Sequence, residues 1–231
     1  MQDSYYEQPS IVYDQGLRKF MLGVFNNMTL ALCISGLIAA FIGTTPELAK
    51  AIWGTPFSLV VIFAPLIMAF FIGFKIHSMT PAGAKLALYV FAGLMGLSLS
   101  HVFVAFTVAS ITQVFFITSA TFGATALYGY TTKRDLSNMG TFLMMGLFGI
   151  IIAGLVNIFM QSSALQFAIS CISVVIFVGF TAYDMQNIKQ MYYDLDGEDR
   201  DRAGVIGALN LYLDFVNIFL SLLELVGIKK D

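Results

Sequence analysis

Long apolar runs, separated by short charged segments, dominate the chain. Four runs contain no Asp, Glu, Lys or Arg: residues 20–46, 51–74, 86–132 and 136–183. A charge at the bilayer centre costs about 2.5 to 3.5 kcal/mol on insertion scales, and a helix needs about 20 residues to cross. The first two runs therefore predict one membrane-spanning helix each. The third and fourth predict two helices each, with short breaks near residues 107–112 and 161–163.

A final run, residues 203–227, is long and apolar enough for a seventh helix, although it contains Asp214 and Glu224. Only helices and closed barrels satisfy their backbone groups in lipid, and these runs lack the alternation of barrel strands. The sequence therefore predicts an all-α polytopic membrane protein, a seven-helix transmembrane bundle. Its membrane domain would span residues 20–228, with a cytoplasmic tail at residues 1–19 and a C-terminal tail at residues 229–231.

Composition agrees with a membrane environment. Of the 231 residues, 58% are hydrophobic and 11% are charged, whereas soluble domains have roughly 45 to 50% and about 25%. No water-facing domain of this length could bury so much apolar surface, so the predicted partner is the lipid bilayer. The net charge is −2 and the basic residues are scattered, which excludes the basic stripe of a nucleic-acid-binding protein.

The basic residues also predict the orientation. If the N-terminus is cytoplasmic, nine Lys and Arg residues face the cytoplasm and three face outward. The inner nine are Arg18, Lys19, Lys75, Lys85, Lys133, Arg134, Lys189, Arg200 and Arg202, and the outer three are Lys50, Lys229 and Lys230. The positive-inside rule favours this arrangement. Lys229 and Lys230 count against it, because they would lie at the outer end of the seventh helix. The alternative is a re-entrant last helix that returns the C-terminus to the cytoplasm.

Polar side chains follow one face of the seventh helix. They recur at steps of four, three, four and three: Asn210, Asp214, Asn217, Ser221 and Glu224. Steps of this size keep side chains on one face of an α-helix. Lipid cannot solvate such a face, so we predict that it lines an ion path inside the bundle. For Glu224 there is an alternative: it lies near the outer interface, where its carboxylate could extend to the lipid headgroups without lining the path.

A second acid, Asp184, ends the fourth apolar run. The sixth and seventh helices are consecutive and antiparallel, so Asp184 can approach Asp214, which lies about 14 Å inside the seventh helix. The sixth helix must then continue past Asp184, and residues 185–191 contain no Pro or Gly. The alternative is that Asp184 is an interfacial helix-end residue and that Asp214 only bonds to a neighbouring amide.

Two carboxyl groups away from bulk water cannot both ionise cheaply, so Asp184 and Asp214 would titrate as one unit. The pair is therefore our predicted pH sensor and gate. When both are charged, their hard oxygens would also attract Ca²⁺, which makes them the candidate metal ligands. No other cofactor is expected, and calcium enters only as a permeant or transiently bound ion.

Two further candidates are weaker. The acidic stretch at residues 194–202 resembles a calcium loop, but an EF-hand would need Gly where Asp199 stands and Glu where Val205 stands. We therefore predict a solvated charged loop. His101 follows Ser98 and Ser100 without the G-x-S-x-G turn of a serine hydrolase, so an interhelical hydrogen bond near the outer interface is the better interpretation. The sequence favours a protein that is not an enzyme.

Three segments together carry a family resemblance: residues 127–136 (LYGYTTKRDL), 181–184 (TAYD) and 207–217 (GALNLYLDFVN). They resemble the Bax inhibitor-1 family, also called the transmembrane Bax inhibitor motif family, and the first is similar to its bacterial branch. The likeness runs from about residue 18 to residue 227.

The resemblance implies seven helices with the last at the centre, in a bacterial inner membrane. It also implies a pH-sensitive calcium leak, with a role in calcium homeostasis, gated by an aspartate pair that Asp184 and Asp214 match. In some members an arginine on the second helix completes the pair, but residues 51–74 contain no Arg or Lys.

Two other functions stay open. Intramembrane aspartyl proteases also carry Tyr-Asp on the sixth helix, as Tyr183 and Asp184 do here. However, the residues before Asp214 are Leu211, Tyr212 and Leu213 instead of a glycine-rich approach, and no Pro-Ala-Leu element follows. A non-conducting scaffold that regulates a membrane quality-control complex is the third possibility. A polar face along a helix fits an ion path better than a docking surface, and no membrane protein partner can be named.

Overall fold

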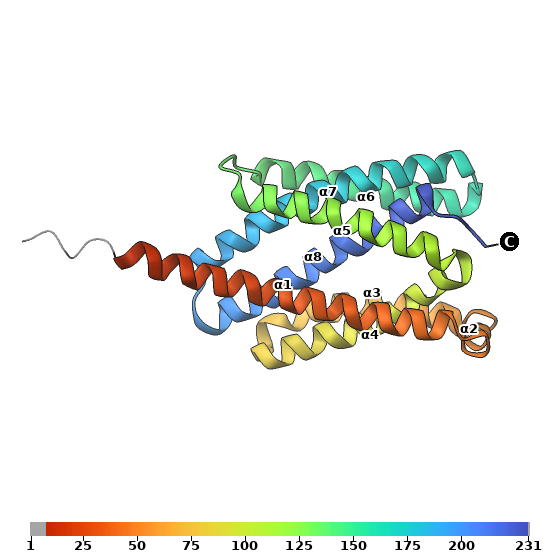
Figure 1. Ribbon diagram of the computed structural model, residues 1–231, viewed down its shortest axis with the longest axis horizontal. Helices are drawn as coiled ribbons and strands as arrows, with labels where there is room; N and C mark the ends of the chain where they lie inside the picture. The colour runs from red at the N-terminus through yellow and green to blue at the C-terminus, as the bar shows by residue number, and fades with distance from the viewer. Residues whose placement is uncertain (1–7, 231) are drawn as a thin grey trace, which may run out of the picture.

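The computed structural model describes residues 8–230, and within them the chain is helical throughout apart from short connections (Figure 1). Its elements are α1 (Gln8–Gly43), α2 (Pro46–Trp53), α3 (Phe57–Lys75), the 3₁₀ turn η1 (Ile76–Ser78), α4 (Pro81–Ala105), α5 (Val108–Thr131), α6 (Ser137–Met160), α7 (Ser163–Asp194) and α8 (Gly197–Val226). Seven of these helices are long and apolar enough to span a membrane. The predicted all-α, multi-pass membrane protein is confirmed.

Both long apolar runs divide where the sequence predicts. Residues 106–107 separate α4 from α5, and residues 161–162 separate α6 from α7. In each case a hydroxyl caps the next helix: Thr107 accepts from the amide of Ser110 at 3.3 Å, and Ser162 accepts from that of Leu165 at 3.3 Å. Such caps satisfy amide groups that the first helical turn leaves unpaired.

Two boundaries differ from the predicted ones. The short helix α2 is unpredicted; it has a proline in its first turn, followed by Glu47, which suits a helix start. At the N-terminus, the predicted tail is helical from Gln8 onward, while its residues 1–7 lie outside the described part of the chain.

The last helix runs the whole length of the bundle. At its start, Arg202 Nη1 donates to the carbonyl of Met79, just before α4, at 2.9 Å. Beyond its end, Lys229 pairs with Phe106, just after α4, in an isolated antiparallel bridge. The re-entrant alternative is therefore wrong. The predicted tail residues 229–230 are held against the α4–α5 connection, and Asp231 lies outside the described residues. We call the end where α1 starts the amino end, and the end where α8 stops the carboxyl end.

Helix α8 lies at the centre, as the resemblance implies. It is the most buried of the seven spans, and in Figure 1 it crosses behind the space between α1 and α5. A hydroxyl network joins it to its neighbours: Ser35 Oγ of α1 donates to the carbonyl of Ala92 of α4 at 2.7 Å and contacts the hydroxyl of Tyr212 at 2.7 Å. Since the serine proton goes to a carbonyl, Tyr212 is the donor to Ser35.

Close helix contacts depend on glycine where α5 meets α7. A Cβ atom added at Gly129 would lie 2.8 Å from the Cα of Ala182, which is backbone and cannot rotate away. We therefore expect Gly129→Ala to lower the free energy of unfolding by about 1 to 3 kcal/mol, the usual cost of overpacking. Denaturant unfolding in detergent micelles measures it. Gly123→Ala on the same helix is the matched control, because its Cβ meets nothing within 4 Å. Equal stability of the two variants would contradict the prediction.

Candidate functional site

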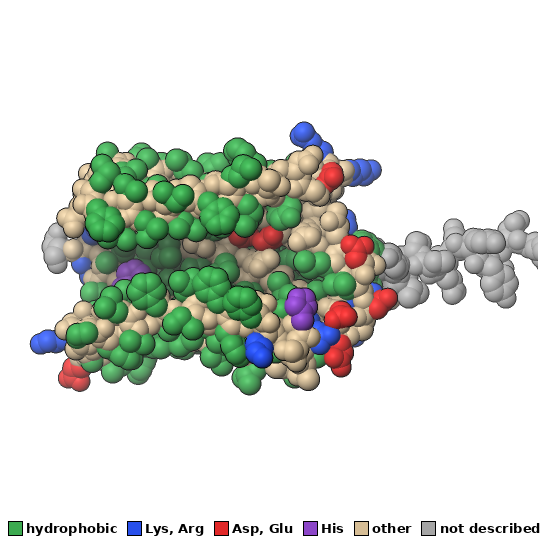
Figure 2. Space-filling model, turned by 180° about the vertical axis from the view of Figure 1, so that it is seen from behind, with side chains coloured by type: hydrophobic (Ala, Val, Ile, Leu, Met, Phe, Trp, Pro, Cys, Tyr) green, Lys and Arg blue, Asp and Glu red, His purple; other side chains and the backbone are tan. Residues whose placement is uncertain are grey.

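A cleft of about 920 Å³ opens between α3, α6, α7 and α8. Helix α3 packs mainly on α4, and α6 packs on α7, with no extensive contact between α3 and α6. The cleft is therefore open to the side of the bundle. Figure 2 shows this face hollowed between two apolar walls, with acidic side chains inside the hollow.

Helix α8 supplies polar groups to the cleft. Asn210, Asp214 and Asn217, three of the five residues on the predicted polar face, line it. Ser221 lies one turn further along and is not among the lining residues. Glu224 lies beyond it and forms an ion pair with Lys229 at 3.0 Å. The lining therefore covers only the first three positions of the predicted polar face, which corrects the expected extent of the path.

Helix α7 brings the second acid to the same cleft. It continues to Asp194, as the predicted approach requires, so that Asp184 is an interior residue and not a helix end. Both Asp184 and Asp214 line the cleft, and the helices that carry them, α7 and α8, pack against each other. Their exposed fractions are 9% and 4%. The structure thus places the two predicted gate residues together in one site.

Asp214 is incompletely bonded. Its Oδ2 atom is buried and has no hydrogen-bond partner within the described part of the chain. The nearby amide of Asn217 donates to the carbonyl of Leu213 on its own helix at 2.8 Å instead. A buried carboxylate oxygen without a donor is costly unless a proton, a water molecule or a cation satisfies it.

The polar groups that α6 contributes to the cleft were not predicted. They are Ser137 and Thr141, which line it together with Tyr183 of α7. Gly140 lets the Tyr183 ring approach, since a Cβ atom there would lie 2.6 Å from it. The signal in the sequence was the pair of hydroxyl residues four positions apart on a mostly apolar helix.

The charges around the pair are all negative. Among the described residues, those that line the cleft include no Lys or Arg, and α3 contributes Leu66 alone. Within the described residues, no three or more His, Cys, Asp or Glu side chains form a metal-binding group. Ca²⁺ takes about six to eight oxygen ligands. Two carboxylates and the neighbouring amide oxygens would therefore bind it only with several of its water molecules retained, as suits a passing ion.

Residues 127–136, which carry the family resemblance, are held beside this site by α7. Gln186 donates to the carbonyl of Arg134 at 2.8 Å and accepts from the amide of Leu136 at 2.8 Å. Lys189 donates to the carbonyl of Tyr130 at 3.2 Å. Asp135 lies in the segment between α5 and α6. Its pKa is lowered mainly by a hydrogen bond from the Ser137 side chain and also by one from the Ser137 backbone amide. The α5–α6 connection is thus fixed to the turn of α7 that follows Asp184.

The acidic stretch is a helix start, which corrects the predicted loop. Only residues 195–196 connect α7 to α8. Glu198 and Asp199 lie in the first turn of α8, where negative charge interacts favourably with the helix dipole. Arg200 pairs with Asp196 at 2.6 Å and Arg202 pairs with Asp199 at 2.6 Å. These acids therefore stabilise the start of α8 and lie apart from the cleft.

We expect the acidic stretch to be dispensable for calcium selectivity. Its five acids are Asp194, Asp196, Glu198, Asp199 and Asp201. Replacing all five with Asn or Gln should leave selectivity in a liposome flux assay unchanged, because the charges are outside the cleft. Unfolding stability should fall by at most about 1 kcal/mol for each lost surface ion pair. Loss of calcium selectivity in this variant would show that the stretch is part of the ion path.

His101 has a packing role. Its Nδ1 atom bonds to the carbonyl of Ser98 on the same helix at 2.7 Å, so the predicted interhelical hydrogen bond is wrong. The ring instead meets the edge of Trp53 of α2, with ring centroids 5.5 Å apart. Trp53 also donates to Ser100 at 3.0 Å. These contacts attach α2 to the carboxyl end of α4.

Comparison with known proteins extends the resemblance over nearly the whole chain. A family model described as inhibitor of apoptosis-promoting Bax1 matches residues 17–231. An uncharacterized protein of Rickettsia prowazekii is 44% identical over 223 residues, which cover 95% of this chain and 93% of that protein. The inner membrane protein YbhL of Escherichia coli is 36% identical over 233 residues, which cover 99% of this chain and 100% of that protein.

Proposed function

This chain belongs to the Bax inhibitor-1 family, and from that premise we propose that it is a pH-sensitive calcium leak channel gated by Asp184 and Asp214. One observation carries the proposal: two buried carboxyl groups share a cleft without any cation of the protein among its lining residues. The unbonded Oδ2 atom of Asp214 leaves a place for a proton or a cation.

The gate would work by competition between protons and calcium. When both carboxyl groups are charged, they repel each other and attract a divalent cation. When a proton is shared between them, the repulsion and the attraction both decrease. Asn210 and Asn217 lie about one turn on either side of Asp214 and line the same cleft, so their amide oxygens extend the polar path along α8.

We further propose that the protein lies in a bacterial inner membrane with its N-terminus in the cytoplasm. The relative from Escherichia coli is named an inner membrane protein. The count of basic residues in the connections supports the orientation. Both carboxyl groups would then lie within the membrane, in the half that is nearer the cytoplasm for Asp184.

The direct test is calcium flux into liposomes that contain the purified protein, measured over a pH series. A leak channel should carry calcium down its gradient, with a rate that changes as the pair takes up protons. Liposomes without protein are the control. A flux that equals this control at every pH would reject the proposal.

A second candidate, an intramembrane aspartyl protease, is favoured by the side opening between α3 and α6, which could admit a substrate helix to both acids. Cleavage of a helical membrane substrate by the purified protein would support it. Cleavage that survives in Asp184→Asn or Asp214→Asn would have to come from a contaminant, since aspartyl chemistry needs both carboxyl groups.

A further inference from the structure

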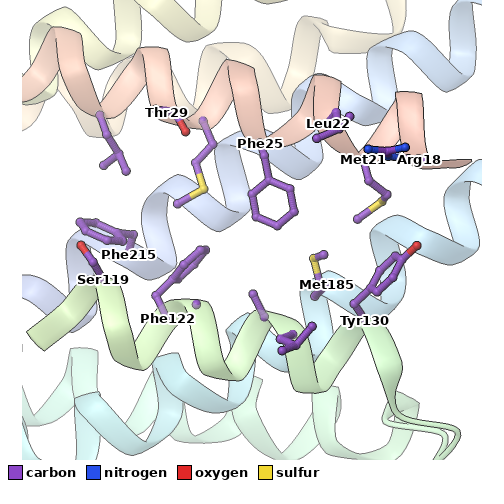
Figure 3. A pocket seen from close by; sticks show the side chains of 15 residues that line it. Arg18, Met21, Leu22, Phe25, Thr29, Ser119, Phe122, Tyr130, Met185 and Phe215 are labelled. Atoms are coloured by element: carbon purple, nitrogen blue, oxygen red, sulfur yellow. The ribbon is translucent and has the colours of Figure 1, made fainter. Parts of the chain in front are cut away.

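A second hollow lies on the other side of α7 and α8, between α1 and α5. These two helices have no extensive contact with each other, and a groove of about 520 Å³ separates them at the amino end. Figure 3 shows side chains of both helices facing each other across this groove. Met185 of α7 and Phe215 of α8 form its floor.

The groove continues toward the carboxyl end. A second cavity of about 320 Å³ shares Leu32 and Phe215 with the first. From Arg18 to Leu32 the groove follows α1 for about 21 Å, which exceeds the roughly 15 Å depth of one leaflet of hydrocarbon. It is therefore long enough to hold an acyl chain along its axis.

The lining changes character along this length. Phe25 and Phe122 face the middle of the groove, and Arg18 and Tyr130 lie on opposite sides of its amino end (Figure 3). Arg18 is exposed, and among the described side chains, residues 15–230, it has no hydrogen-bond or ion-pair partner. A second cation, Lys189, lies near the same end, with its Nζ atom 5.0 Å from the centre of the Tyr130 ring. The groove thus has an apolar body and a cationic end, and no acidic residue among the described side chains lines it.

We propose that this groove binds an anionic phospholipid of the leaflet at the amino end, with its phosphate on Arg18 and one acyl chain between α1 and α5. Hydrocarbon fills the apolar body of such a groove more favourably than water does. A guanidinium group binds phosphate oxygens with two parallel hydrogen bonds. A lipid with net negative charge is preferred because no headgroup cation competes with Arg18.

The groove and the acidic cleft lie on opposite sides of α7 and α8. Its floor residues, Met185 and Phe215, directly follow Asp184 and Asp214 in the chain. The acids line the cleft on one side of α7 and α8, and their neighbours line the groove on the other. A bound acyl chain therefore supports the back of the wall that carries the acids.

The test measures lipid binding, not ion flux. The purified full chain is titrated in detergent with dioleoyl phosphatidylglycerol or dioleoyl phosphatidylcholine, and bound lipid is counted by native mass spectrometry. The wild type should bind phosphatidylglycerol more tightly. Arg18→Gln should weaken that binding roughly fivefold. Lys75→Gln, which removes an equal charge from the last residue of α3 at the amino end of the bundle, should have no such effect.

A second pair of variants tests the acyl position. A side chain at Gly123 on α5 would enter the groove, and its Cβ meets nothing within 4 Å. Gly123→Phe should therefore keep the fold and weaken the binding of both lipids. Gly149→Phe on the exposed face of α6 also has open space and is the matched control.

Three results would overturn the proposal. Equal losses in Arg18→Gln and Lys75→Gln would mean that only general surface charge attracts the lipid. Unchanged binding in Gly123→Phe would place the lipid elsewhere. A dimer in the mass spectra that Gly123→Phe dissociates would make a second copy of the chain the occupant. Because binding is measured without flux, each of these results leaves the leak proposal untouched, and absence of leak leaves the lipid site untouched.

Discussion

Replacing Asp214 with asparagine is expected to lower calcium leak into liposomes by at least about tenfold, which corresponds to about 1.4 kcal/mol. Asparagine keeps the shape of the side chain but can neither carry charge nor take up a proton. The variant therefore loses the attraction for a divalent cation in the cleft. Its flux should also depend much less on pH than that of the wild type, because one partner of the titrating pair is gone.

Glu224→Gln is the control for this experiment. It removes one negative charge from the same helix, but Glu224 lies beyond the cleft and pairs with Lys229 at 3.0 Å. Flux and pH profile in this variant should resemble those of the wild type. An unchanged Asp214→Asn protein would reject the gate. Equal losses in both variants would mean that overall charge, and not the position of Asp214, sets the flux.

The polar face of α8 could be predicted because it depends on local geometry alone. Steps of three and four place Asn210, Asp214 and Asn217 on one side of any α-helix, and the structure confirms that they line one cleft. The approach of Asp184 was predictable for a related reason. Consecutive helices with a short connection are antiparallel neighbours, and residues 185–191 hold nothing that would end α7.

The end of that polar face depends on contacts between distant residues. Ser221 and Glu224 continue the period, but the residues after α8 turn back to the α4–α5 connection and bring Lys229 to Glu224. Helical spacing has no information about this pairing. Ser137 and Thr141 were missed for the same reason, because only the packing of α6 on α7 brings them to the cleft.

The start of α8 had a local signal that the calcium-loop comparison obscured. Asp196 is a favourable residue before a helix, and Glu198 and Asp199 suit its first turn. Gly197 follows with a φ of 54°, a left-handed conformation in which glycine has no steric cost. The groove between α1 and α5 had no such signal. Its lining residues look like ordinary lipid-facing positions, and only the separation of the two helices reveals it.

The second large effect concerns the coupling of the two acids. Asp184→Asn and Asp214→Asn should each remove most of the pH dependence of calcium flux, and the double variant should remove little more than either single change. If one proton is shared, removal of either carboxyl group already abolishes the shared titration. Residues more than about 7 to 10 Å apart without common partners instead show additive effects within roughly 0.3 to 0.5 kcal/mol.

The control is a second double-mutant cycle, which combines Asp214→Asn with Glu224→Gln. These two acids are ten residues apart on the same helix, and therefore about 15 Å apart. This pair should be additive, which calibrates the assay against general charge effects. A non-additive result for Asp184 with Asp214, next to an additive result for Asp214 with Glu224, assigns the coupling to the cleft. If both cycles are additive, the acids titrate independently, and the shared-proton gate is wrong even in a protein that leaks calcium.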